Sequence, residues 1–102
     1  TAIIDRNHLE ISGDTEEVMR LGSLASKWEA FGWAVRRSDG HDLDLIEETL
    51  RAVPFEQGKP SMIIADTIKG KGVSFMEDKL LWHYRCPDGD EYECAMKELE
   101  DA

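Results

Sequence analysis

The chain has 102 residues, with 22 Asp and Glu against 12 Lys and Arg, which gives a formal net charge of -10 at pH 7. This charge repels phosphate backbones and anionic lipid surfaces, so we expect neither nucleic acid nor a membrane as a partner. No apolar run reaches the roughly 18 to 20 residues of a membrane span, and no secretory signal pattern is present, so we expect a soluble, cytoplasmic protein.

Strand-like and helix-like patterns alternate along the first two thirds of the chain. Compact apolar and β-branched runs are typical of buried parallel strands, and apolar residues at three- and four-residue steps are typical of amphipathic helices. The expected elements are a strand at 2–4, a helix at 14–31, a strand at 33–35, a loop at 38–42, a helix at 43–53 and a strand at 61–65.

Capping and breaking residues mark the expected helix ends. Asp14 can cap the first helix, which Gly22 can divide, and Gly32 lies where a left-handed glycine would end it. Pro54 stops the second helix. Residues 67–90 are too irregular for an assignment, and a last amphipathic helix is expected at about 91–100.

Alternating strands and helices predict an α/β fold, a three-layer parallel sheet with right-handed βαβ crossovers. Three strands are few for a parallel sheet, because both of its faces must be covered. We therefore expect this sheet to be a piece of a larger one.

Polar loops leave the carboxyl ends of the expected strands, where open α/β sheets bind their ligands. The loop at 5–15 is rich in the oxygen side chains that hard cations such as Mg²⁺ prefer. A calcium-binding EF-hand loop is excluded, because Leu9 and Glu10 occupy the positions of an oxygen ligand and of the turn glycine. The alternative is an ordinary strand-to-helix turn whose side chains satisfy the backbone.

Further candidates lie in the last third of the chain. Residues 67–73 carry two glycines and two lysines after a strand, which suggests an anion site without Walker A spacing; the alternative is a solvated loop. His83 is a candidate acid-base group, with a structural role as the alternative. Cys86 and Cys94 match neither zinc nor disulfide spacing, so we expect two reduced thiols.

Four segments, taken in order and spacing, resemble those of transketolases. The closest resemblance is to the C-terminal part of the thiamine-diphosphate-binding domain, and to the short N-terminal subunits of split transketolases. The segments are KWEAFGW at 27–33, DGHD at 39–42, TIKGKGVS at 67–74 and WH at 82–83.

This resemblance implies a role for five residues. Asn7, through its amide, and Leu9, through its backbone carbonyl, would bind the Mg²⁺ that holds the cofactor's diphosphate, adding no charge beside it. Ile11 would pack against the cofactor and Lys69 would lie close to it. His83 would reach the diphosphate and the substrate oxygens, with an acid-base or polarising role.

Other parts of the family's site are expected elsewhere. A Gly-Asp-Gly segment, which supplies a further magnesium ligand, is expected before Asn7, so residues 1–102 are predicted to be a single partial domain. The glutamate that activates the cofactor belongs to a pyrimidine-binding subunit or domain. Asp5 is expected to shape its turn rather than bind metal. Tyr84 replaces the Gly that commonly follows the Trp-His pair, which puts the local substrate contacts in question.

The resemblance also implies a reaction. A two-carbon ketol unit would pass between ketose and aldose phosphates, with thiamine diphosphate and magnesium, at a dimer interface of a homo- or hetero-oligomer. The isolated chain is then expected to have negligible turnover. Three alternatives remain open: a related enzyme such as deoxyxylulose-phosphate synthase, a non-catalytic assembly module that pairs through a sheet edge, and a truncation product.

Overall fold

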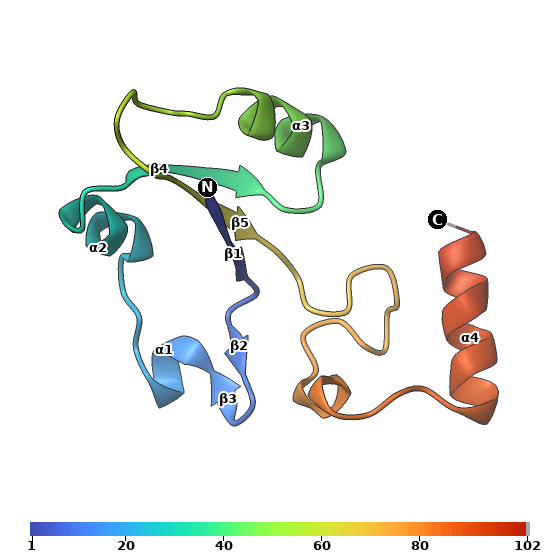
Figure 1. The fold of residues 1–102 in the computed structure, drawn as a ribbon. Coiled ribbons are helices and arrows are strands. Elements are labelled where there is room, and N and C mark those ends of the chain that lie inside the picture. Colours follow the sequence, from blue (N-terminus) through green and yellow to red (C-terminus); the bar gives the residue numbers. More distant parts are fainter. Residues whose placement is uncertain (102) are drawn as a thin grey trace. The chain divides into compact units, whose positions relative to one another are not determined.

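The computed structural model describes residues 1–101, and their contacts divide them into two compact units. The first unit holds residues 1–7 and 19–67, and the second holds residues 8–18 and those from 68 onward. In chain order the elements are β1 (Ala2–Arg6), β2 (Leu9–Glu10), β3 (Gly13–Asp14), α1 (Thr15–Val18), α2 (Leu24–Ala30), β4 (Ala34–Asp39), α3 (Leu43–Arg51), β5 (Ser61–Asp66), the 3-10 helix η1 (Leu80–His83) and α4 (Gly89–Glu100) (Figure 1).

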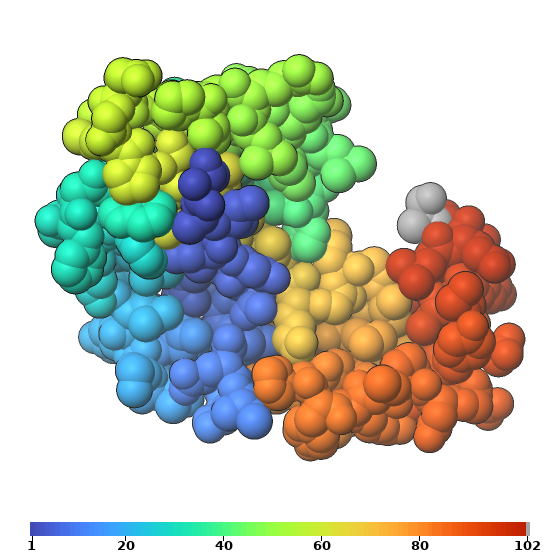
Figure 2. Space-filling view, viewed as in Figure 1, coloured from blue at the N-terminus to red at the C-terminus, as the bar shows by residue number. Residues whose placement is uncertain are grey.

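The first unit is built on a parallel sheet with the order β1-β5-β4. β5 pairs on both sides, so its apolar side chains are the most enclosed: Met62, Ile63 and Ile64 are 4% exposed or less. β1 is an edge strand, and its Ile3 is 59% exposed. Part of β1, dark blue, is accordingly visible at the surface in the space-filling view (Figure 2).

Helices cover both faces of this sheet, with α3 on one face and α2 on the other (Figure 1). The chain passes from β1 across to β4 through α2, and then returns to β5 through α3. Because these two crossovers run in opposite directions, a shared right hand requires helices on opposite faces. The α/β fold with a three-layer parallel sheet is therefore confirmed.

The ends of several predicted elements differ in the structure. The predicted loop at 38–42 is wrong at its start, because β4 continues through Ser38 and Asp39, which pair in register with the end of β5. The predicted helix at 14–31 is divided at Gly22, as expected, into α1, which lies in the second unit, and α2. Gly22, with φ of 58°, lies in the break, and Ser23 caps α2 by accepting a hydrogen bond from Ser26 N at 3.2 Å.

The second unit contains two elements that the sequence did not predict, the hairpin β2–β3 and the helix η1. Asp14 acts as the predicted cap of α1, because its carboxylate accepts a hydrogen bond from Glu16 N at 2.7 Å. α4 begins at Gly89, two residues before the predicted start, and Ala95 is its buried residue. In the part of the chain that the structure describes, no helix is long and apolar enough to cross a membrane.

The central strand supports the first prediction. Replacing Ile64, which is 2% exposed, with Ala removes packed methyl groups and leaves a cavity, so we expect the free energy of unfolding to fall by about 2–5 kcal/mol. Urea denaturation of the full chain measures this change. The matched control is Ile3→Ala on the edge strand, where a loss below about 1 kcal/mol is expected; equal losses at the two sites would contradict this description of the core.

Candidate functional site

The three strands of the first unit end at the same level. In the register of the sheet, Arg6 at the end of β1 and Asp39 at the end of β4 both pair with Asp66 at the end of β5. The residues that follow the strands therefore leave from one edge, and they include Asn7, Gly40 and Thr67. Open α/β sheets bind ligands at this edge.

A network of hydrogen bonds joins the strand ends at this edge. Gly40 N donates to Asp66 O at 2.8 Å, and Thr67 N donates to Arg6 O at 3.2 Å. The Thr67 hydroxyl also donates to the carboxylate of Asp5. The backbone hydrogen bonding thus continues one residue past β4, at Gly40, and one residue past β5, at Thr67.

An ion pair closes the same edge on the β4 side. Arg37 Nε donates to Asp66 Oδ2 at 3.0 Å, and a second guanidinium nitrogen donates to Oδ1. The hydrogen bond to Asp66, and the attraction of its negative charge, raise the pKa of Arg37 above its ordinary value. The Arg37 side chain is 60% exposed and that of Asp66 35%, so the pair contributes at most about 1 kcal/mol to stability. Its main effect is to fix the direction of the Asp66 carboxylate.

Asn7 and Leu9, the predicted magnesium ligands, are half-buried and flank His8. His8 has φ of 63°, in the left-handed region that residues other than glycine seldom adopt, and such residues cluster at functional sites. The carbonyl of His8 accepts a hydrogen bond from Thr15 N at 2.9 Å. Asn7 is the last residue of the segment 1–7, which belongs to the first unit. Leu9 is the first residue of β2, which belongs to the second unit.

The donor chemistry at these two positions suits magnesium. A side-chain amide and a main-chain carbonyl are neutral oxygen donors of the kind that Mg²⁺ accepts. Among the described residues, no group of three or more His, Cys, Asp or Glu side chains could hold a metal ion.

The remaining predicted site residues, Ile11, Lys69 and His83, all lie in the second unit. The Ile11 side chain is 65% exposed at the turn of the β2–β3 hairpin, and an exposed apolar group there is free to contact a ligand. Lys69 is half-buried, and its carbonyl accepts a hydrogen bond from Asp78 N at 3.0 Å. His83 is exposed and is the last residue of η1.

The lysine loop, residues 68–79, has a defined internal structure. Backbone hydrogen bonds close turns at Lys71 and Val73, and Val73 is buried. Gly70, with φ of 75°, lies so close to Met76 that a Cβ at this position would be 2.7 Å from the Met76 carbonyl oxygen. Lys71 Nζ lies 3.8 Å from a carboxylate oxygen of Glu77. Glu77 therefore offers Lys71 a partner within the loop itself.

Trp82 anchors the helix that presents His83. Its indole N–H donates to Phe75 O at 3.2 Å, and its ring packs edge-on against the Phe75 ring at 5.5 Å. The Arg85 guanidinium stacks over the same indole at 5.0 Å and is paired with Glu91. These contacts fix Trp82 and Arg85, which precede and follow His83 in the chain, while the His83 imidazole stays exposed.

α4 is tied to the lysine loop through a carboxylate. Glu98 accepts two hydrogen bonds from Ser74, one from the backbone N–H and one from the hydroxyl at 2.7 Å. The backbone hydrogen bond, followed by the hydroxyl, lowers the pKa of Glu98 below its ordinary value. The loop and α4 therefore share a contact that depends on an ionised group.

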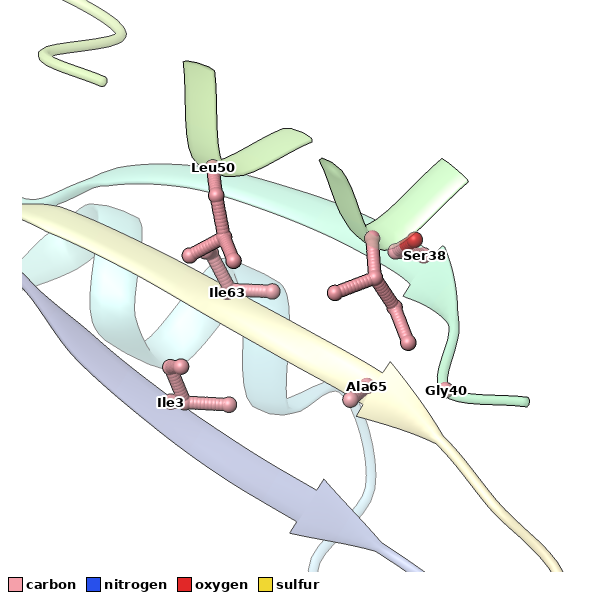
Figure 3. A pocket seen from close by; sticks show the side chains of 7 residues that line it. Ile3, Ser38, Gly40, Leu50, Ile63 and Ala65 are labelled. Atoms are coloured by element: carbon pink, nitrogen blue, oxygen red, sulfur yellow. The ribbon is translucent and has the colours of Figure 1, made fainter. Parts of the chain in front are cut away.

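An apolar pocket lies in the first unit between α3 and the sheet, with a volume of about 120 Å³. Leu50 from α3 and Ile63 from β5 point toward one another across it (Figure 3). None of the lining side chains is ionisable, so this space offers no group for catalysis. The lining residues are Ile3, Ser38, Gly40, Ile46, Leu50, Ile63 and Ala65.

A parallel sheet whose strand ends carry polar groups and lead into glycine-bearing loops defines an α/β protein of the ligand-binding class. Residues 1–98 match the family model described as "Transketolase, thiamine diphosphate binding domain". The chain therefore belongs to the transketolase family, in its thiamine diphosphate binding domain.

Individual relatives agree with this assignment. The chain is 46% identical over 100 residues to an apulose-4-phosphate transketolase subunit of Phocaeicola vulgatus, covering 98% of this chain and 36% of that protein. It is 44% identical over 99 residues to the 6-deoxy-6-sulfo-D-fructose transketolase subunit SqwG of a Clostridium species, with coverage of 97% and 36%. Human transketolase is 37% identical over 82 residues, which are 80% of this chain and 13% of that protein. The chain thus spans about a third of the length of the first two relatives.

Sequence reasoning missed the contacts that join the strand ends. Thr67 and Gly40 lay within recognised segments but received no role, and Arg37 and Asp66 were not singled out. Their one signal in the sequence is position, since Gly40, Asp66 and Thr67 lie at or directly beside the end of a strand and Arg37 lies two residues before the end of β4. The partners themselves come from different segments, so no local pattern identifies them.

The Glu98 contact predicts a pH-dependent stability. Because the pKa of Glu98 is lowered in the fold, its contribution is present above the ordinary glutamate range and is lost as the pH falls through the lowered value. We expect the full chain to be more stable to urea than its Glu98→Gln variant at neutral pH, and the two to converge in acid. Urea unfolding curves, recorded by circular dichroism at a series of pH values, measure this.

The control for this experiment is Glu93→Gln, a substitution at an exposed position on the same helix. It should keep the pH dependence of the unchanged chain. A stability gap between the full chain and Glu98→Gln that stays constant down to acid pH would contradict the role of the ionised carboxylate.

Proposed function

We propose that this chain is part of a transketolase-type enzyme, which transfers a two-carbon ketol unit between ketose and aldose phosphates. The observation that carries the proposal is the match of residues 1–98 to the family's thiamine diphosphate binding domain. When bound, thiamine diphosphate supplies the electron sink that allows the bond beside the ketose carbonyl to break. The part played by this chain is to bind and orient the reacting groups.

In this proposal Asn7 and Leu9 hold the magnesium ion of the cofactor. The Asn7 amide oxygen and the Leu9 carbonyl oxygen add ligands without adding negative charge beside a diphosphate. The position of Asn7 directly after β1, at the edge where this fold class binds ligands, supports its role. Ile11 provides apolar contact area, and Lys69 lies near the cofactor.

His83 is the proposed acid-base residue. Its exposed imidazole can donate a proton to, or accept one from, an oxygen of the substrate. The anchoring of Trp82 supports this role, because a side chain next to a fixed residue loses less freedom when it meets its substrate.

The substrate and partner are inferred from relatives. One relative is named for apulose-4-phosphate and another for 6-deoxy-6-sulfo-D-fructose, so we propose a sugar substrate with an anionic end group. Both names describe a subunit, which supports a second, pyrimidine-binding subunit in a hetero-oligomer. The chain spans 36% of these relatives, so we place the Gly-Asp-Gly segment outside residues 1–102 and assign these residues to the C-terminal part of the domain. Turnover by residues 1–102 alone should then be negligible.

The magnesium role of Asn7 is tested in the complete protein once it is assembled with its partner subunit. Asn7→Ala removes an oxygen ligand, so we expect affinity for thiamine diphosphate with magnesium to fall at least about tenfold in a calorimetric titration. Ser12→Ala, at an exposed position in the hairpin turn, is the control and should bind normally. Normal binding by Asn7→Ala would refute the proposal, and a change only in how the subunits associate would favour an assembly module.

The acid-base role of His83 is tested by steady-state kinetics of the same assembly. His83→Asn keeps a polar side chain but cannot transfer the proton, so we expect kcat to fall by about 10²–10⁴. Tyr84→Phe at the neighbouring exposed position is the control. If kcat is unchanged in His83→Asn, then His83 is not the acid-base group.

A further inference from the structure

Thr67 contacts the ends of both neighbouring strands at once. Its backbone N–H donates to Arg6 O at 3.2 Å, and its hydroxyl donates to the Asp5 carboxylate. Its methyl group lies against Gly40, where a Cβ would be only 2.4 Å from Thr67 Cγ2. Each of the two branches of this side chain therefore has its own partner, the hydroxyl at β1 and the methyl beyond β4.

Gly40 leaves the methyl group little freedom. Its own N–H is bonded to Asp66 O at 2.8 Å, so its backbone is held against β5. A Cβ at this position would also approach Asp66 O at 3.1 Å and Ala65 Cβ at 3.2 Å. Because a β-branched side chain is stiff at χ1, a methyl group that is fixed beside Gly40 also fixes the direction of the hydroxyl.

The hydroxyl and the N–H of Thr67 hold β1 at its last two residues. Asp5 and Arg6 immediately precede Asn7, and Asn7 belongs to the same compact unit as Thr67. The hydrogen bond to the Arg6 carbonyl restrains the backbone that leads to Asn7, and the hydrogen bond to the Asp5 carboxylate ties the side chain two residues before Asn7 to Thr67. A ligand that is oriented before its ion arrives binds with a smaller loss of conformational entropy.

We propose that Thr67 is a positioning residue, which holds the end of β1 so that the Asn7 amide oxygen is oriented toward the magnesium ion of thiamine diphosphate. This inference rests on the function proposed above. Thr67 acts through Asp5 and Arg6, without contacting the ion itself. Gly40 acts indirectly, because its contact with the Thr67 methyl group sets the direction of the Thr67 side chain.

Two substitutions separate the hydroxyl from the methyl group. Thr67→Val keeps the branched shape and removes the hydroxyl, whereas Thr67→Ser keeps the hydroxyl. The Asp5 side chain is exposed, so water can solvate its carboxylate in Thr67→Val, and we expect the fold to be retained. Gly40→Ala should displace the Thr67 methyl group and behave like Thr67→Val.

The experiment is a calorimetric titration of thiamine diphosphate at a series of magnesium concentrations, using the complete protein assembled with its partner. At limiting magnesium we expect Thr67→Val to bind about 10- to 100-fold more weakly, the usual effect of losing a group that orients a metal ligand. Excess magnesium should reduce this defect, and Thr67→Ser should bind nearly normally. Without cofactor, amide hydrogen exchange at residues 5–8 should be faster in Thr67→Val than in Thr67→Ser.

Asn7→Ala, titrated in parallel, separates the two proposals. Normal binding by Thr67→Val, together with defective binding by Asn7→Ala, would overturn the role of Thr67 alone. Normal binding by both variants would overturn the proposed function and this inference together. A defect in Thr67→Val that excess magnesium does not reduce, or that Thr67→Ser shares fully, would show a general structural loss and would also overturn the inference.

Discussion

The pairing of β5 with both of its neighbours is the constraint on which the first unit depends. β5 supplies the most enclosed apolar side chains, and its register with β1 and β4 brings all three strands to an end at one level. The polar residues that follow the strands therefore meet at a single edge. In a parallel sheet this edge is the place where a ligand can be bound by several loops at once.

Asp66, the last residue of β5, and Thr67, which follows it, also bond to residues at or near the ends of the neighbouring strands. Asp66 accepts the Gly40 N–H through its backbone and binds Arg37 through its carboxylate. Thr67 continues the ladder to β1, one residue before Asn7. A few hydrogen bonds thus link the packing of an apolar strand to the backbone beside Asn7, the residue that we propose as a magnesium ligand.

Much of this fold could be predicted from the sequence, and the misses have physical causes. β5 was predicted because its residues are nearly all apolar, as a strand that is buried on both faces requires. The end of β4 was not predicted because Arg36, Arg37 and Ser38 are polar and do not look like part of a buried strand. They can belong to β4 because it is an edge strand, which tolerates polar side chains. Asn7, Leu9, Ile11, Lys69 and His83 were assigned through a resemblance of ordered motifs, whereas the contacts of Thr67 join segments far apart in the chain and leave no local pattern.

The central claim is that the end of β1 delivers Asn7 to a magnesium ion. A crystal structure of the assembled protein with thiamine diphosphate, in which Mn²⁺ replaces Mg²⁺, would locate the ion by anomalous scattering. We expect the ion within coordination distance of the Asn7 amide oxygen and the Leu9 carbonyl oxygen. An ion bound by other residues, with Asn7 turned away from it, would contradict the account.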